Sequence, residues 1–350
     1  MRYSWNELHR FASQCFQVAG VPPADAEWTA EVLVRADFTG VHTHGLSRLS
    51  AYIQGIRRGV IKAAPDTALE KRALSVATLD GDSGLGPVVA KLAMEAAVDL
   101  AKETGIGIVT VKRGNHAGPL SAYIDLATQA EMIGWAFSNA QPAIPPWGGR
   151  KAFFGTNPIA FGAPTHCHSP VVLDMATSKV ARGNIILAAK TGQSIPEDWA
   201  IDETGCPTTD AQAALRGAVL PMAGPKGYAL ALMVEILSGV LSGAEMAPHV
   251  GSMYDKEQRE PGTGLCCIAI NPRSFFDGDE FYRRMDVLVD EIHQVPPADG
   301  FSSVRIPGER RVRLEHQGRQ EGIALEQSTL DELKKLAEEL HIAWRDDLFV

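Results

Sequence analysis

The sequence predicts an α/β protein with a sheet-containing middle and helical ends. From residue 73 onward, short apolar runs alternate with stretches of helical periodicity, which is the pattern of a buried sheet covered by helices. Apolar residues at helical spacing fill most of the N-terminal part and return near the C-terminus. With 350 residues, 45% of them hydrophobic, the chain is long enough for two domains. We therefore expect a helical domain from residues 1–72 with 312–350, and an α/β domain from residues 73–311.

The N-terminal helices are defined by their end signals. Ser4 and Glu7 have the spacing of a capping box, which predicts a helix that begins at about residue 5. Two consecutive prolines then break the chain, and a second helix is expected to end near Asp37. A third helix is expected over residues 45–58, with Gly59 as its C-terminal cap.

The last helix is expected over residues 328–340. Ser328 and Asp331 lie at capping-box spacing, with aspartate in place of the usual glutamate. Leucines recur at helical spacing from Leu330 to Leu340 and form an apolar stripe. We expect this stripe to pack beside the N-terminal helices.

The middle of the chain alternates between strands and helices. Residues 191–220 lack a clear periodicity, so we expect an irregular excursion there rather than part of the core. Strands are predicted at residues 73–79, 106–111, 134–138, 158–163, 171–174 and 264–271, and helices at residues 87–102, 119–129, 178–190, 224–241 and 278–294.

Composition excludes several classes of partner. The formal net charge is −9 and the pI is about 5.6, which argues against nucleic acid and against an anionic membrane surface. Five cysteines, an odd number without a CxxC pair, indicate reduced thiols in a cytosolic protein. The N-terminus lacks an apolar signal core, and no apolar run is long enough to span a bilayer. We therefore expect a cytoplasmic protein that binds neither nucleic acid nor membrane.

The most informative stretch is residues 37–48, in which His44 precedes Arg48 by four positions. If a helix begins here, the two side chains share one face. Imidazole can give or take a hydroxyl proton near neutral pH, and arginine can bind a carboxylate through two parallel hydrogen bonds. The pair indicates proton transfer on a small organic acid, and a capped helix start with two exposed polar residues is the alternative.

Two histidine pairs also have the spacing of metal ligands. His42 with His44, and His166 with His168, each match an HxH pattern. The first pair has no further Asp, Glu or Cys ligands in a neighbouring motif, and His166-Cys167-His168 is isolated, so we expect no metal.

A second candidate, His116, follows the strand predicted at residues 106–111 and is flanked by Gly114 and Gly118. A histidine in a turn beyond the carboxyl end of a strand is well placed to face a cleft. A turn histidine bonded to backbone is the alternative, and it is favoured by these residues alone.

Residues 80–89 follow a strand and open a helix, as a dinucleotide-binding fingerprint does. Gly84 and Gly86 supply the first two glycines of that motif, but Val89 occupies the third position. Pro87 also lacks the N–H that would face pyrophosphate. A standard Rossmann site is therefore not expected, and a tight glycine turn in the wall of the active site is favoured.

Three further turns carry groups suited to binding. Thr156 and Asn157 can donate side-chain hydrogen bonds to a carboxylate or a carboxamide, and an ordinary Asn-Pro turn is the alternative. Residues 174–178 end a strand and start a helix, where backbone can line a cleft. Lys226 at a helix start could neutralise a phosphate together with the backbone N–H groups, and a solvated surface lysine is the alternative.

Taken together, these motifs resemble the type 2 malate/L-lactate dehydrogenase family, the sulfolactate dehydrogenase-like oxidoreductases, whose relatives include ureidoglycolate dehydrogenase and 2,3-diketo-L-gulonate reductase. Each motif is modest alone, but five of them in the family's order, between about residues 30 and 310, are highly specific. They are Gly-Val-His-Thr-His-Gly with the following arginine at residues 40–48, Asn-His-Ala-Gly at 115–118, Phe-Gly-Thr-Asn-Pro at 154–158, Asp-Met-Ala-Thr-Ser at 174–178 and Gly-Pro-Lys-Gly-Tyr at 224–228.

The resemblance implies the family's own NAD(P)-binding α/β fold, which is not a Rossmann fold, and a homodimer with the active site near the subunit interface. NAD or NADP is implied as the cofactor, with NAD slightly favoured. The residues expected to contact the nucleotide are Ser138, Asp174, Met175, Ala176, Lys226, Gly227, Gly308, Glu309 and Arg310.

The resemblance also implies the residues that act on the substrate. His44 is the proton donor in some branches and His116 the proton acceptor in others, so both are candidates. Thr43 stands where many relatives have serine, and it keeps a hydroxyl for a proton relay. The residues expected to bind substrate are Arg48, Thr156, Asn157 and Arg182.

A departure from the family pattern bears on the substrate. Relatives often have lysine or aspartate after the Ala-Arg-Gly of residues 181–183, and this chain has Asn184, which cannot ionise. In cyclic imine reductases a carboxylate in this neighbourhood joins the proton relay, so Asn184 disfavours that branch.

The sequence therefore predicts reversible hydride transfer between NAD(P) and C2 of a small 2-hydroxy or 2-keto acid of the malate/L-lactate type. Arg48 would pair with the substrate carboxylate, and His116 or His44 would remove the hydroxyl proton. The alternatives are reduction of a cyclic imine carboxylate, oxidation of ureidoglycolate, and a silent relative that binds NAD(P) without turnover. The exact substrate, the physiological direction and the proton-transferring histidine stay open.

Overall fold

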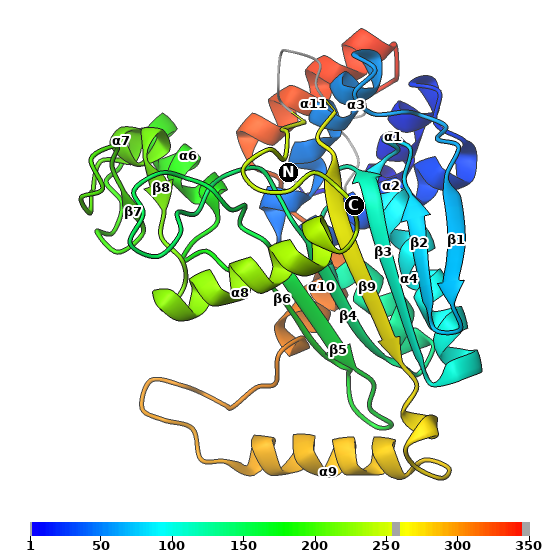
Figure 1. Ribbon diagram of the computed structural model, residues 1–350. Coiled ribbons are helices and arrows are strands. Elements are labelled where there is room, and N and C mark those ends of the chain that lie inside the picture. The colour runs from blue at the N-terminus through cyan, green and yellow to red at the C-terminus, as the bar shows by residue number, and fades with distance from the viewer. Residues whose placement is uncertain (1, 254–259, 345–350) are drawn as a thin grey trace.

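The computed structural model describes residues 2–253 and 260–344, and its centre is a seven-stranded mixed sheet in the order β1-β2-β3-β9-β4-β5-β6 (Figure 1). Within the sheet β2 and β3 are parallel, and the other described pairs are antiparallel. This differs from the parallel sheet of a Rossmann domain. The strands are β1 (Ala68–Ala73), β2 (Val76–Asp80), β3 (Ile106–Gly114), β4 (Ile133–Ser138), β5 (Ile159–Ala163), β6 (Val171–Met175) and β9 (Thr263–Ile270), and a separate hairpin holds β7 (Ala200–Ile201) and β8 (Ala218–Val219).

Helices cover both faces of the sheet. Cys266 and Cys267 are consecutive in β9, so they point to opposite faces, and both are buried. Cys267 contributes to the core beneath α4 and α5, whereas Cys266 packs with Val234 of α8. The helices are α1 (Trp5–Val18), α2 (Pro23–Phe38), α3 (Leu49–Arg57), α4 (Gly86–Thr104), α5 (Ser121–Gln129), α6 (Arg182–Thr191), α7 (Ala211–Arg216), α8 (Pro225–Glu235), α9 (Glu280–Gln294), α10 (Glu309–Glu321) and α11 (Gln327–Leu340), with the 3₁₀ turns η1 (His42–His44), η2 (Leu46–Arg48) and η4 (Pro272–Ser274) and the π-helix η3 (Ile236–Val240).

The N- and C-terminal helices share one hydrophobic cluster. Leu8, Phe16 and Leu33 of α1 and α2 are buried in the same cluster as Leu333 and Leu336 of α11. The prediction that the last helix packs beside the N-terminal helices is therefore confirmed. Residues at the start of α4 also belong to this cluster, so the division at residues 72 and 312 stays a prediction.

The ends of several elements differ from the predictions. The cap at Ser4 is confirmed, since its Oγ accepts from Glu7 N at 3.3 Å. The cap predicted at Ser328 is wrong: α11 begins one residue earlier, after Glu326, and no side chain caps it. The third helix begins only at Leu49, because two 3₁₀ turns precede it. The predicted helix at residues 178–190 begins at Arg182.

The sheet contains a strand that the sequence did not predict. The strand expected over residues 73–79 begins at Val76, and a turn separates it from β1. Because β1 is exposed along its whole length and contains glutamate, lysine and arginine, it lacks the apolar signal of a buried strand. The strongly charged helix α10 was missed for the same reason.

The prediction of an irregular excursion at residues 191–220 is wrong. This segment joins α6, α7 and the β7–β8 hairpin in a small unit with its own buried cluster, to which Ile185, Ile195 and Val219 contribute. Figure 1 shows the unit beside the sheet, beyond one end of α8. Short elements and many alanines hid the periodicity.

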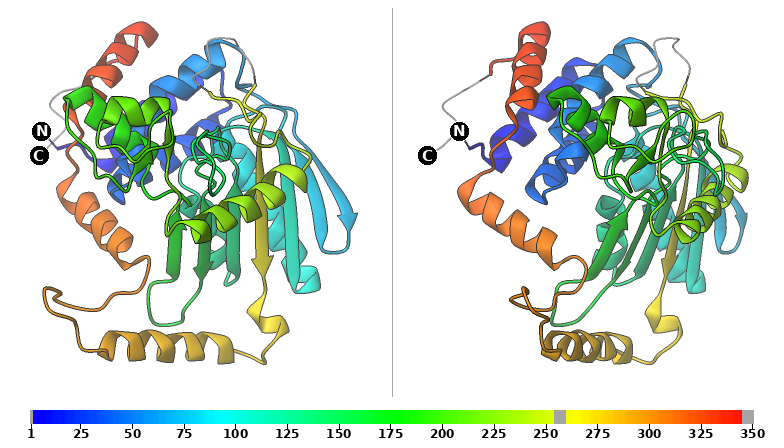
Figure 2. Two further views of the ribbon diagram at one scale, coloured as in Figure 1. Left: turned by 60° about the vertical axis from the view of Figure 1, so that its left-hand side comes forward. Right: turned by 90° about the vertical axis from the view of Figure 1, so that its left-hand side faces the viewer.

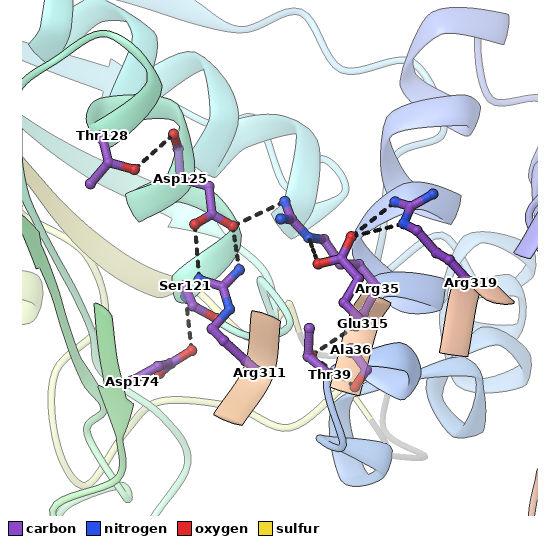
Figure 3. Close-up of polar contacts among 10 residues, drawn as sticks. All are labelled: Arg35, Ala36, Thr39, Ser121, Asp125, Thr128, Asp174, Arg311, Glu315 and Arg319. Atoms are coloured by element: carbon purple, nitrogen blue, oxygen red, sulfur yellow. Dashed lines mark hydrogen bonds and ion pairs between the residues drawn. The ribbon is translucent and has the colours of Figure 1, made fainter. Parts of the chain in front are cut away.

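Charged side chains tie three helices together around Asp125 of α5 (Figure 3). Asp125 accepts a two-pronged ion pair from Arg311 of α10, in which Nη1 lies 2.8 Å from Oδ1 and Nη2 pairs with Oδ2. Arg35 of α2 places Nη1 3.0 Å from Asp125 Oδ2 and Nε 3.0 Å from Glu315 Oε2. Asp125 is buried, so its charge depends on these partners.

We expect Asp125→Asn to lower the free energy of unfolding by about 3 kcal/mol, because two guanidinium groups would lose a buried counter-charge. Urea denaturation at pH 7 measures the change. Asp99→Asn is the matched control, since its pair with Lys102 is exposed and is expected to contribute less than about 1 kcal/mol. Equal destabilisation by the two substitutions would contradict this account of the network.

Candidate active site

The register of the sheet brings the candidate residues to one end. Phe137 of β4 pairs with Ile159 of β5, which in turn pairs with Met175 of β6. The end of β4, the start of β5 and the end of β6 therefore lie in one row. These are the points at which Ser138, the Thr156 turn and the Asp174 turn meet the sheet.

The same end of the sheet holds the His116 turn. Ser138 pairs with Leu265 near the start of β9, and Gly114 at the end of β3 pairs with Thr263. Because His116 follows Gly114 by two residues, it lies at the same end as the row described above.

Two histidines from distant motifs face each other here. The rings of His44 and His116 are stacked, with centroids 5.4 Å apart and planes 22° apart. Thr43 Oγ1 lies 2.9 Å from His44 Nδ1, and Arg48 Nε donates to Thr43 O at 2.6 Å. His44 and Arg48 do not share a helix face, since each ends its own 3₁₀ turn, but this local bond still holds them together.

Tyr52 is a contact of His116 that the sequence reading missed. Its Oη lies 2.7 Å from His116 Nδ1 and donates to His116 O at 2.9 Å. Because Tyr52 donates its hydroxyl proton in the bond to the backbone carbonyl, its oxygen is left to accept from His116 Nδ1–H. The other ring nitrogen, Nε2, then keeps its lone pair. Tyr52 lies on α3 and follows Arg48 by four residues, and this spacing was the available signal.

Both imidazoles lie in surroundings that disfavour their charged forms. Burial lowers the pKa of His44 to about 4, and the positive charge of Arg48 adds to this effect. Burial also lowers the pKa of His116 well below its usual value, with further contributions from His44 and Arg48. Two neutral rings at pH 7 follow, and a neutral ring can accept a proton.

A buried carboxylate shapes the turn that carries His44. Asp37 Oδ2 accepts from Leu46 N at 2.7 Å, and Oδ1 accepts from His42 Nδ1 at 3.0 Å. Any Cβ at Gly45 would overlap the Asp37 carboxylate, so this position requires glycine. The hydrogen bond to Asp37 raises the pKa of His42, which is thereby a structural partner of the turn. The sequence reading gave Asp37 no such role.

The glycine turn at residues 81–86 lies directly against the His116 turn. Asn115 Nδ2 donates to Ser83 O and to Gly84 O, both at 2.9 Å. A Cβ at Gly86 would overlap His116 O, so the close approach of the two backbones requires glycine there. This geometry supports the interpretation of the turn as a wall of the site.

Backbone hydrogen bonds join the three polar turns at residues 154–158, 174–178 and 224–228. Thr156 O accepts from Thr177 N at 2.8 Å and from Thr177 Oγ1 at 2.9 Å. Thr177 O accepts from Met222 N at 2.9 Å, and Met222 O accepts from Gly227 N at 3.0 Å. The motifs at residues 154–158, 174–178 and 224–228 therefore form one connected wall.

The residues expected to hold a nucleotide differ in their exposure. Met175 is 41% exposed, and Lys226 is exposed in the first turn of α8, which no side chain caps. Asp174 Oδ2 accepts from Ser121 N at 2.8 Å (Figure 3). Ser138 is buried, and its Oγ donates to Asn139 O at 2.9 Å. Pro225 has no N–H and Gly227 N donates to Met222 O, so the first turn of α8 offers the backbone N–H and the ammonium of Lys226 to an anionic ligand.

The loop at residues 308–310 lies beside β6, because Val172 N donates to Pro307 O at 2.9 Å. Gly308 precedes the first residue of α10, and Ala176 is half-buried at the end of β6. Glu309 Oε1 lies 2.6 Å from His293 Nε2, so this carboxylate already has a partner. A methyl group built on Gly40 would lie 3.6 Å from Arg310 Nη2, which places Arg310 near the first motif.

Asn157 does not have the geometry of a substrate ligand. It is 0% exposed, and its Nδ2 donates to Ala231 O and to Glu235 Oε2, both at 2.9 Å. Its Oδ1 accepts from Ala140 N at 3.2 Å. Both amide hydrogens are used inside the protein, so the prediction that Asn157 donates to substrate is wrong.

Arg182 opens onto a cavity of about 490 Å³. A methyl group at Gly183 would lie 3.4 Å from Thr43 Cγ2, so the turn that carries Arg182 adjoins the His44 motif. Arg182 Nη1 donates to Pro142 O at 3.2 Å. The charged residues of the cavity wall are Arg150, Lys151, Arg182, Glu203 and Arg216.

Among residues 2–253 and 260–344, no cluster of three or more His, Cys, Asp or Glu side chains is arranged to hold a metal. The His-Cys-His segment docks on α9 instead: Asp286 Oδ1 accepts from His166 N and Cys167 N at 3.0 Å, and His168 Nε2 lies 3.0 Å from Asp290. The described helices include none with both the length and the apolar character to cross a membrane.

The fold and the site define an α/β enzyme in which paired neutral imidazoles lie beside an arginine at one end of a mostly antiparallel sheet. The sequence profile of the malate/L-lactate dehydrogenase family matches residues 3–334, and the chain belongs to this family. The resemblance drawn from the five motifs is confirmed.

Individual relatives have names that point to different hydroxy acids. The L-sulfolactate dehydrogenase of Methanocaldococcus jannaschii is 41% identical over 93% of this chain and 94% of its own length. The solved sulfolactate dehydrogenase structure from that organism has a TM-score of 0.91 at 39% identity, covering 98% of both chains. The (2R)-3-sulfolactate dehydrogenase (NADP(+)) of Chromohalobacter salexigens is 37% identical over 95% and 97%. The ureidoglycolate dehydrogenase (NAD(+)) of Escherichia coli K12 is 36% identical over 93% of both proteins.

The lowered pKa of His44 predicts that this residue makes stability depend on pH. The ring titrates near 6.5 in the unfolded chain and near 4 in the folded chain, so the unfolded state binds the proton more readily between these values. The free energy of unfolding therefore falls as the pH falls from about 6.5 toward 4.

Urea denaturation of the wild type and of His44→Gln at pH 6.5 and pH 5 tests this dependence. We expect the free energy of unfolding of the wild type, relative to that of the variant, to be about 1 kcal/mol smaller at pH 5 than at pH 6.5. This value is below what the full pKa shift would give, because His44 is partly exposed. An advantage that stays constant or grows at pH 5 would show that His44 is not held neutral.

Proposed function

We propose that this protein is an NAD(P)-dependent dehydrogenase that transfers hydride between nicotinamide and C2 of a small 2-hydroxy or 2-keto acid. The stacked neutral pair of His44 and His116, held beside Arg48, is the observation that carries the proposal. Membership of the malate/L-lactate dehydrogenase family supports it.

The residues at the other side of the site fit a dinucleotide. The uncapped start of α8, with the ammonium and the backbone N–H of Lys226, suits a phosphate. The exposed Met175 and the backbone of Ala176 offer an apolar surface and hydrogen-bonding groups at the end of β6. The rest of this surface would be formed by Gly227, Gly308, Glu309, Arg310 and the end of β4 at Ser138. When bound, NAD(P) supplies the group that accepts or returns the hydride.

His116 has the geometry of the proton acceptor for the hydroxy acid. Tyr52 fixes the ring in the form that leaves Nε2 unprotonated, so that atom can take the hydroxyl proton. His44, with Thr43 on its Nδ1, stacks on His116 and is a second neutral imidazole in the site. Arg48 would bind the substrate carboxylate and fix the orientation of C2.

Substrate binding and proton transfer are coupled in this arrangement. In the free protein the positive charge of Arg48 helps to keep both rings neutral. A bound carboxylate offsets that charge, which raises the pKa of the neighbouring imidazoles toward the working range of a general base. The site therefore becomes a better proton acceptor when its anionic substrate is present.

The cavity at Arg182 favours substrates with a second negative charge. Four cationic side chains and one carboxylate line it, in a chain whose net charge is −9. The first turn of α6, which carries Arg182 and Gly183, adjoins Thr43, and this is the side on which we propose that a second anionic group of the substrate binds. We propose a dianionic 2-keto acid, such as a dicarboxylate or a sulfonated acid, as the preferred substrate.

The arm formed by residues 271–307, which includes α9, supports a homodimer. Both views in Figure 2 show α9 at the end of the molecule opposite α11, joined to the body by extended segments. Large apolar side chains are exposed along it, among them Phe275, Val287 and Phe301. Such a surface suits a protein partner. Sedimentation equilibrium tests the proposal, and a monomer at all protein concentrations would contradict it.

The proposed activity is tested by following NADH and NADPH oxidation by absorbance with oxaloacetate, sulfopyruvate, pyruvate and a cyclic imine carboxylate. We expect turnover with the dianionic keto acids, and the better nucleotide identifies the cofactor. Turnover only with the imine would overturn the keto acid proposal despite Asn184. Nucleotide binding without any turnover would indicate a silent relative.

We expect Arg48→Lys to lower kcat/KM at least about tenfold, because one ammonium cannot reproduce the planar fork or the bond from Nε to Thr43 O. Steady-state kinetics with the best keto acid measure the loss. Arg57→Lys, at the end of the helix that follows Arg48 and in an exposed pair with Glu339, is the control and should keep wild-type kinetics. Unchanged kinetics for Arg48→Lys would remove this residue from substrate binding.

The cavity proposal predicts a selective effect of Arg182→Gln. We expect KM for oxaloacetate to rise about tenfold, the size of one charge-assisted hydrogen bond, while KM for pyruvate changes little. Parallel kinetics with the two substrates give the comparison within a single variant. Equal effects on both substrates would show that Arg182 does not recognise the second anionic group.

A further inference from the structure

A buried carboxylate lies at the end of α8, behind the wall of polar turns. Glu235 is 4% exposed, and its Oε1 accepts from Ala247 N at 2.7 Å and from Asn139 Nδ2 at 3.2 Å. Its Oε2 accepts from Asn157 Nδ2 at 2.9 Å. The described contacts of Glu235 thus all come from uncharged N–H donors. A buried carboxylate is expensive unless its oxygens are hydrogen-bonded, so the placement of these donors is demanding.

The local fold makes room for this group. The helix changes from α to π immediately after Glu235, at Ile236–Val240. A Cβ at Gly239 would lie 2.8 Å from Glu235 Oε1 and 3.1 Å from Asn139 Nδ2, so the absence of a side chain there admits both polar groups. The change from α-helix to π-helix and Gly239 therefore both lie next to the Glu235 carboxylate.

The donors come from the segments that form the proposed binding wall. Asn139 follows Ser138 at the end of β4, and Asn157 follows Thr156 at the start of β5. Glu235 itself belongs to α8, whose first turn carries Lys226. One carboxylate therefore connects the end of β4, the substrate turn and the nucleotide helix, none of which are adjacent in sequence.

Asn139 and Asn157 extend the same cluster to neighbouring backbone. Asn139 Oδ1 accepts from Gly264 N at 2.8 Å, and its Nδ2 also donates to Glu245 O at 2.8 Å. Asn157 Oδ1 accepts from Ala140 N, and its Nδ2 donates to Ala231 O. The orientation of each amide is therefore fixed, and neither can turn over to suit a changed partner without losing these bonds.

We propose that Glu235 is a positioning residue of the active site, which holds the Thr156 turn and the end of β4 in register with the first turn of α8. The inference rests on the proposed function, because these three segments carry Ser138, Thr156 and Lys226, which are proposed to bind nucleotide and substrate. Glu235 does not contact the reacting atoms in this account. It sets the geometry in which Thr156 meets substrate and Lys226 meets the nucleotide.

The proposal is tested by exchanging the carboxylate of Glu235 and the amide of Asn157. In Glu235→Gln, the new Nε2 faces the Nδ2 of Asn157, so two donors meet and the cluster must rearrange. We expect kcat/KM to fall about 100-fold, as a shift of about 1 Å in a binding group can cause, and the Kd for NADH to rise. In the double variant Glu235→Gln with Asn157→Asp, the donor again faces a carboxylate oxygen and Ala140 N keeps an acceptor, while Ala231 O loses its donor, so the expected recovery is partial.

We expect the double variant to regain at least about tenfold in kcat/KM over Glu235→Gln, although it is more changed in sequence. Asn157→Asp alone places two carboxylates against each other and should be worse than the double variant. Comparison of the double variant with the single variants remains informative if a single variant folds poorly. The double variant is then expected to restore both folding and kinetics. Glu315→Gln is the matched control for loss of a carboxylate elsewhere, and it should change unfolding by urea but not kinetics.

Two results would overturn the proposal. One is a folded Glu235→Gln whose kcat, KM and NADH Kd match the wild type, even if its stability is lower. The other is a folded double variant with no recovery over the single variants. Failure of the proposed function is recognised separately, because the wild-type protein itself would then show no turnover, and NADH binding measured by fluorescence would still report on the cluster.

Discussion

The antiparallel register around β9 is the constraint on which the site depends. It aligns the end of β3, the start of β9, the end of β4, the start of β5 and the end of β6 at one edge, although these points are spread over residues 114–263. Turns that are far apart in sequence can then form one wall through backbone hydrogen bonds. Helices on both faces bury the strands, so a change of register would move core side chains to the opposite face and disrupt their packing against both helical layers. The turns that we propose to bind ligand take their positions from this packing.

Electrostatics divide that end of the sheet between two tasks. One side keeps two imidazoles neutral, chiefly by burial and further by the charge of Arg48, and we propose that a bound anion raises their pKa values by offsetting that charge. The other side offers a helix start and backbone groups, which suit a charged nucleotide without the need for a dedicated acidic or basic motif. Buried polar clusters behind each side, centred on Asp37 and Glu235, hold the turns in place.

The sequence predicts those parts of this arrangement that depend on local signals. Most core helices and strands were located by periodicity, and His44, Arg48 and His116 were identified because residue type and spacing carry chemical meaning. The exposed strand β1 and the charged helix α10 lack an apolar pattern, so periodicity could not reveal them. Asn157 was given a substrate role because its partner, Glu235, lies 78 residues away and only the fold brings them together. Tyr52 could have been found from its spacing to Arg48, but its bond to His116 could not.

The protonation of the two histidines is the most direct test of the account. NMR of protein with ¹⁵N-labelled histidine would report the charge and tautomer of His44 and His116, assigned with single variants, as a function of pH. We predict neutral rings at pH 7 in the free protein, with the proton of His116 on Nδ1, and a higher pKa for at least one ring when NADH and a non-reacting carboxylate analogue are bound. Protonated rings in the free protein at pH 7, or pKa values that do not respond to the bound carboxylate, would contradict the coupling of substrate charge to proton transfer.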